Sequence, residues 1–137
     1  IVLISEEEKD RLADKMDEIG QRISAPFFSR DAQNVRHSFA IMLIGTDNST
    51  RGLNCGYCGY ATCHEKPEKS PCVFNLTDLG IALGSTASSA MQMKIDNRIL
   101  FSAGKAALEL GFCGENMPII FALPLSVSEK NIFFDRK

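Results

Sequence analysis

The pattern of apolar and polar positions predicts a helix near the start of the chain. Residues 5–8, with sequence SEEE, form a capping box whose acidic residues suit the first turn of a helix. Leu12, Met16 and Ile19 then recur at helical spacing, while charged residues fill the other faces. We therefore expect a surface helix over residues 5–22, with one side packed on the core.

Two apolar runs predict strands. Residues 38–45 form a continuous apolar run without alternation, which suits a strand covered on both faces. Residues 118–127 form a second run, but Pro124 lacks an amide N–H and favours a sheet edge or a bulge. A short helix beginning at Ser29 is expected over residues 29–35, and residues 132–134 are expected to form a short strand or a docking tail.

Two further helices are expected between these strands. The first, over residues 77–93, is rich in small residues and has no charge between Asp78 and Lys94. Because such a helix has no face suited to water, we place it centrally, buried within the protein or in a subunit interface. The second helix is expected from residue 96 to 110, with Gly111 as the residue that ends it.

The intervening segment, residues 46–76, is rich in Gly, Pro, Asn, Thr and Ser and predicts a loop. A loop of this length inside a compact domain needs a function or a cross-link. The 137 residues suffice for one ordinary domain, so we expect a single α+β domain over residues 1–137 with this loop embedded in it. The chain begins at Ile1 rather than Met, and we expect the natural protein to have further N-terminal residues.

Four of the five cysteines, Cys55, Cys58, Cys63 and Cys72, fall within this loop. An odd number with four clustered argues against a secreted disulfide framework and for a metal or redox site in a reducing compartment, the cytoplasm. Thiolates at short spacing hold iron–sulfur clusters or zinc. Four-cysteine zinc sites usually pair two Cys-x2-Cys knuckles, and this chain has one, so the spacing favours an iron–sulfur cluster over zinc, and over disulfides or free thiols. Cys113 stands apart and is expected to be a buried small hydrophobe.

Composition and charge exclude two classes of partner. Fifteen Lys and Arg against 17 Asp and Glu give a formal net charge of −2, without the basic excess that phosphate binding needs. We therefore expect no nucleic-acid partner. No run of about 18 apolar residues is present, so no membrane span is expected.

Residues 55–63, with sequence CGYCGYATC, resemble the C-G-x-C-G-x-x-x-C signature of the iron–sulfur domain in electron-transport and carbon monoxide dehydrogenase complexes. That resemblance implies a [4Fe–4S] cluster, although those domains usually place the fourth ligand further downstream than Cys72. A longer pattern resembles a family of uncharacterised prokaryotic proteins containing a ferredoxin domain. It covers roughly residues 40–137 and rests on the segments 51–53 with the cysteines, 78–82, 96–98 and 104–107.

The chain from Asp78 onward is also similar, more weakly, to the central helix of flavin-dependent nitroreductases. This likeness implies an α+β fold with an antiparallel-dominated sheet and a central buried helix, and an intertwined homodimer. It also allows FMN as a cofactor, with the flavin phosphate contacted by basic residues that are otherwise solvated: Arg98, Lys130, Arg136 and Lys137.

Three functions follow from these observations. The first is an iron–sulfur protein for electron transfer or redox sensing, which implies a redox partner protein. The alternatives are a flavin-dependent oxidoreductase of nitroreductase-like fold and a zinc-stabilised structural domain. The uncharged stretch from Leu79 to Met93 further predicts a homodimer, because its small residues would let the backbone of a second copy approach closely.

Overall fold

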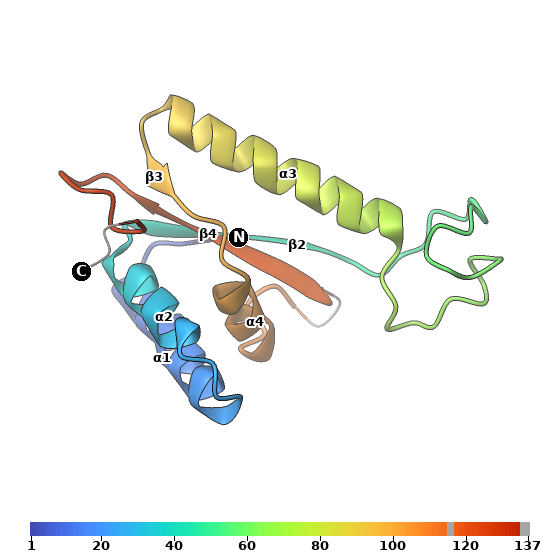
Figure 1. Ribbon diagram of the computed structural model, residues 1–137, viewed down its shortest axis with the longest axis horizontal. Helices are drawn as coiled ribbons and strands as arrows, with labels where there is room; N and C mark the ends of the chain where they lie inside the picture. Colours follow the sequence, from blue (N-terminus) through green and yellow to red (C-terminus); the bar gives the residue numbers. More distant parts are fainter. Residues whose placement is uncertain (115–116, 135–137) are drawn as a thin grey trace.

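The chain folds into a four-stranded antiparallel sheet with helices on both faces (Figure 1). The computed structural model describes residues 1–114 and 117–134. In chain order the elements are β1 (Val2–Leu3), α1 (Glu6–Arg22), α2 (Phe27–His37), β2 (Ala40–Thr46), α3 (Val73–Gln92), β3 (Asp96–Asn97), α4 (Phe101–Glu109) and β4 (Ile119–Ser126). The strand order is β1-β2-β4-β3. The expected mixture of helices and a small antiparallel sheet is confirmed.

The first helix, α1, begins where the capping box predicts. The hydroxyl of Ser5 accepts a hydrogen bond from the backbone N–H of Glu8 at 3.3 Å, and Leu12 and Met16 are fully buried. The second helix, α2, begins at Phe27, two residues before the predicted start, so Ser29 does not cap it. The cause is the preceding Pro26, whose fixed φ suits a helix start.

One face of the sheet is covered by α1, α2 and α4, which together enclose the core (Figure 1). The approach of α4 to β4 is especially close, since a Cβ placed on Gly104 would lie 1.9 Å from the carbonyl oxygen of Ile120. Only glycine permits this contact. The core consists mainly of aliphatic and alanine side chains from both layers, among them Leu12, Met16, Ile19, Phe28, Val35, Ile41, Leu43, Ala103, Ala107, Ile120 and Ala122.

The position of Pro124 in the sheet differs from the prediction. Strand β4 is paired on both sides, with β2 and with β3, so an edge position is wrong. Ala122 exchanges two backbone hydrogen bonds with Leu100, at 2.8 and 3.1 Å. The backbone nitrogen of Pro124, two residues further on, points to the same side of β4 as that of Ala122. It lies between the Leu100–Ala122 bridge and the first residue pair with β3, Asn97↔Leu125. The missing N–H therefore falls at a break in the pairing.

Both predicted helices that flank β3 need correction at their starts. Helix α3 begins at Val73 rather than Thr77. It therefore starts directly after Cys72, at the end of the cysteine segment. Asp96 and Asn97 are not helical but pair with β4, so α4 begins only at Phe101. Pairing with a strand distant in sequence has overridden the local helical pattern. Gly111 ends α4 as predicted, with φ of +68°.

Helix α3 lies alone on the opposite face of the sheet (Figure 1). Only one stripe of it is buried, formed by Asn75, Leu79, Leu83 and Ala90, whereas Ile81 on the far side is 66% exposed. The prediction that this helix is buried within one chain is wrong, because no other element covers its outer side in the described part of the chain. The alternative, a subunit interface, stays a prediction.

The described C-terminal residues form a docked turn rather than a strand. Phe133 is buried, and its carbonyl oxygen accepts a hydrogen bond from Arg98 Nη1 at 2.9 Å. The docking-tail alternative is therefore confirmed. None of the described helices is both long and apolar enough to cross a membrane.

Candidate metal centre

The cysteine segment, residues 47–72, connects β2 to α3 and contains no helix or strand. Figure 1 shows it as the green coil that projects beyond the end of the sheet. Cys55, Cys58 and Cys63 lie within the coil, and Cys72 is the residue before α3. Of the predicted loop, Thr46 belongs to β2 and residues 73–76 belong to α3. That the irregular residues between them bind a cluster stays a prediction.

Three residues in left-handed conformation turn the backbone around the first two cysteines. Asn54 has φ of +48°, and the glycines that follow Cys55 and Cys58 have φ of +73° and +89°. Glycine adopts this conformation without strain, and Asn tolerates it better than most residues. The carbonyl oxygen of the first glycine, Gly56, accepts the N–H of Gly59 at 3.0 Å, which closes a turn around Cys58.

The side chain of Asn54 joins the two ends of the CGYCGYATC motif. Its Oδ1 accepts a hydrogen bond from the backbone N–H of Cys63 at 2.8 Å. The third cysteine of the motif is therefore held next to Asn54, the residue before the first cysteine. This contact brings the backbones near Cys55 and Cys63 together. Sequence reasoning missed Asn54, although an Asn directly before a cysteine knuckle is a signal for a left-handed turn.

Cys72 is buried at the N-terminus of α3, and its pKa is lowered. Burial by itself raises the pKa of this thiol, but backbone N–H groups of Phe74, Asn75 and Arg51 act in the opposite direction and outweigh it. The Arg51 guanidinium adds to the lowering. Because the thiolate is the form that binds metal, the lowered pKa suits the role predicted for Cys72 as a ligand.

The four sulfur atoms are not gathered into one site in this structure. All five cysteines are free thiols; Cys55 is exposed, and Cys58 and Cys63 are half-buried. Among the described residues, no three His, Cys, Asp or Glu side chains lie close enough together to hold a metal ion. Convergence of the four cysteines therefore stays a prediction. The chemistry of the donor set fits an iron–sulfur cluster, since four thiols lie on or at the end of one coil, and thiolates are the usual ligands of such clusters.

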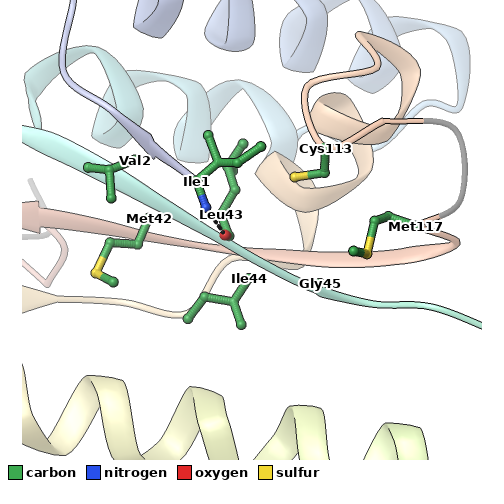
Figure 2. A pocket seen from close by; sticks show the side chains of 8 residues that line it. All are labelled: Ile1, Val2, Met42, Leu43, Ile44, Gly45, Cys113 and Met117. Carbon is green, nitrogen blue, oxygen red and sulfur yellow. Dashed lines mark hydrogen bonds between the residues drawn. The ribbon is translucent and has the colours of Figure 1, made fainter.

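Cys113 lies in a different environment from the other four. It is half-buried against the core, and burial raises the pKa of its thiol. It lines a cavity of about 390 Å³ beside β1 and β2, together with Met117 (Figure 2). In that view Met42 and Ile44 point toward α3, whereas Cys113 lies across the strands from them. A thiol held protonated in apolar surroundings suits packing better than metal binding.

The basic residues named for a flavin phosphate are only partly described. Arg98 is engaged within the protein, because it donates to the Phe133 carbonyl and its guanidinium lies 5.2 Å from the ring centroid of Phe134. Arg136 and Lys137 lie outside the described residues. A flavin site at these positions stays a prediction.

Comparisons with known proteins agree with the ferredoxin-domain resemblance. The family model described as "Uncharacterized protein containing a ferredoxin domain (DUF2148)" matches residues 68–136. An uncharacterized protein of Archaeoglobus fulgidus is 38% identical over 146 residues, an alignment that covers 99% of this chain and 78% of the relative. The chain therefore belongs to this family of ferredoxin-domain proteins. No solved structure matches it, so the nitroreductase-like fold stays a prediction.

Proposed function

We propose that this protein binds an iron–sulfur cluster of the [4Fe–4S] type and serves in electron transfer or redox sensing. Cys55, Cys58, Cys63 and Cys72 are the proposed ligands. The family's ferredoxin-domain description supports an iron–sulfur protein. The single observation that carries the assignment is the coil with four cysteines, which ends at Cys72, buried directly before α3.

A bound cluster would supply one-electron chemistry, and the chain would supply ligands, charge compensation and access. The N–H groups at Cys72 would offset negative charge on that ligand. Cys55 is exposed and Tyr57 is 72% exposed, so a redox partner protein could approach this side of the coil. We expect such a partner to share the reducing compartment, the cytoplasm.

The proposal includes the organisation of the chain. Residues 1–137 would form one domain, with residues 46–76 as its embedded cluster-binding loop. We also propose a homodimer through α3. Its exposed positions include a stripe without charge, at alternating spacings of four and three residues, on the side opposite the buried stripe: Thr77, Ile81, Gly84, Ser88 and Met91. A neutral face can meet its own copy without repulsion between like charges.

Anaerobic purification followed by metal and chromophore analysis tests the function. Iron and acid-labile sulfide bound to the protein, with a broad absorption band near roughly 400 nm, would support the proposal. Stoichiometric zinc without sulfide would instead indicate a zinc-stabilised structural domain. Flavin released on denaturation, with FMN as its identity, would indicate the nitroreductase-like oxidoreductase.

A further inference from the structure

Polar contacts connect the two ends of the cysteine segment. We call these contacts the loop base; they involve Asp47, Ser49, Arg51, Asn75 and Asp78. At its centre is Asn75, which lies in the first turn of α3 and is 1% exposed. Its Nδ2 donates to the backbone oxygen and Oδ1 of Asp47, both at 3.1 Å, and to the backbone oxygen of Ser49 at 2.8 Å. These contacts join the residues that follow β2 to the helix that follows Cys72.

The other contacts of the loop base are more exposed. The Asp47 carboxylate accepts the N–H of Ser49 at 3.0 Å and its hydroxyl at 2.6 Å, which orders the start of the segment. Arg51 pairs with Asp78 at 3.0 Å, but both side chains are at least half exposed, and such pairs contribute little. Asn75 is therefore a buried side chain that connects the two ends, beside the contact of the Arg51 backbone N–H with Cys72.

Asn75 acts through its amide hydrogens alone. Its Oδ1 is buried and has no hydrogen-bond partner within the described part of the chain, whereas Nδ2 faces three acceptors. Aspartate at this position would keep the shape of the side chain, remove both donated hydrogens, and place a second carboxylate against Asp47.

We propose that Asn75 is a positioning residue for the cluster, fixing Cys72 relative to the coil that carries the other three cysteines before metal arrives. This inference rests on the proposed function. Cys72 and Asn75 are three residues apart at the start of α3. The hydrogen bonds of the Asn75 amide to Asp47 and Ser49 therefore also fix the position of the backbone at Cys72. Closing a loop costs conformational entropy, and a base that is already closed lowers the cost of bringing the cysteines to one centre.

The first test uses the metal-free, reduced protein and Asn75→Asp. The rate of Cys72 alkylation by iodoacetamide, resolved by peptide mass spectrometry, measures how often the base opens. We expect an increase on the order of tenfold, because a buried residue loses its hydrogen bonds. The matched control is Asn97→Asp at the other end of α3, where Asn97 is 9% exposed and its Nδ2 donates to Ala87 and Ile95 at 3.3 and 3.1 Å. An equal increase in both variants, or none in Asn75→Asp, would overturn the inference.

The second test uses protein reconstituted with iron and sulfide. Asn75→Asp is expected to bind less iron per chain and to shift the reduction potential, since a displaced Cys72 changes the surroundings of the cluster, while Asn97→Asp matches the wild type. Wild-type iron content and potential in a folded Asn75→Asp variant would contradict the positioning role. Failure of the wild-type protein to take up iron would overturn the proposed function, and the alkylation contrast would still support closure of the base by Asn75.

Discussion

Asn54 and Cys63 are joined by a hydrogen bond of 2.8 Å that closes the cysteine motif on itself. The bond needs both an acceptor on the side chain and a backbone that tolerates φ of +48° at residue 54. Asn and Asp meet both requirements, whereas Gly meets only the second.

Replacing Asn54 therefore separates the two requirements. We expect Asn54→Gly to lower the iron content of reconstituted protein several-fold, because the third cysteine is no longer held near the first. Asn54→Asp keeps the acceptor and is expected to bind nearly as much iron as the wild type. Equal iron content in the two variants would show that the bond does not organise the site.

The pKa values of the Cys72 and Cys113 thiols are expected to lie on opposite sides of the value of an ordinary cysteine. In the metal-free protein the pKa of Cys72 is lowered by backbone N–H groups despite burial, and the pKa of Cys113 is raised by burial. As the pH rises, the Cys72 thiolate therefore forms first. The pH profile of alkylation, followed residue by residue, should rise at lower pH for Cys72 than for Cys113. The reverse order would be inconsistent with these environments.

Gly104 is expected to be essential for the packing of α4 on β4. In Gly104→Ala the added Cβ would meet the Ile120 carbonyl oxygen at 1.9 Å, so the helix must shift. Overpacking of this kind typically costs about 1–3 kcal/mol, which urea denaturation would detect as a lower midpoint. Gly80→Ala is the control, because a Cβ there meets nothing within 4 Å and helix propensity improves. A Gly104→Ala variant as stable as the wild type would show that this contact is less tight than described.

Charge placed on the outer side of α3 should break the proposed homodimer without unfolding the chain. A Cβ at Gly84 has no neighbour within 4 Å, so Gly84→Lys is sterically tolerated in a single chain. Analytical ultracentrifugation at tens of micromolar, roughly the range in which stable dimers persist, should find a wild-type dimer and a Gly84→Lys monomer. The control Gln33→Lys, at an exposed position of α2 on the other side of the sheet, should remain dimeric. A monomeric wild-type protein would end the interface proposal.

The sequence predicted those parts of the fold whose signals are local. The capping box at Ser5 and the apolar run of β2 each describe their own element. Strand β3 was not predictable in this way, because Asp96 and Asn97 become a strand only by pairing with Ser126 and Leu125. The early start of α3 was not predictable either, because cysteine is not a typical N-cap residue, and the Cys72 side chain makes no capping hydrogen bond.

The residues of the candidate site also differ in whether a local sequence signal identifies them. The cysteines themselves are visible in the sequence, since four thiols at short spacing are unusual. Asn75 is not, because its role depends on contacts with Asp47 and Ser49, which lie 28 and 26 residues earlier in the chain. A polar residue within an apolar helix start is the only local signal that it carries.

The most direct test of the central claim is the iron and acid-labile sulfide content of single Cys→Ser variants after anaerobic purification. Serine is a poor substitute for a soft thiolate, so replacement of Cys55, Cys58, Cys63 or Cys72 should lower both contents. Cys113→Ser is the control and should retain them, because Cys113 packs against the core. Loss of the cluster in Cys113→Ser with retention in Cys72→Ser would contradict the ligand set, and wild-type protein without iron or sulfide would contradict the account as a whole.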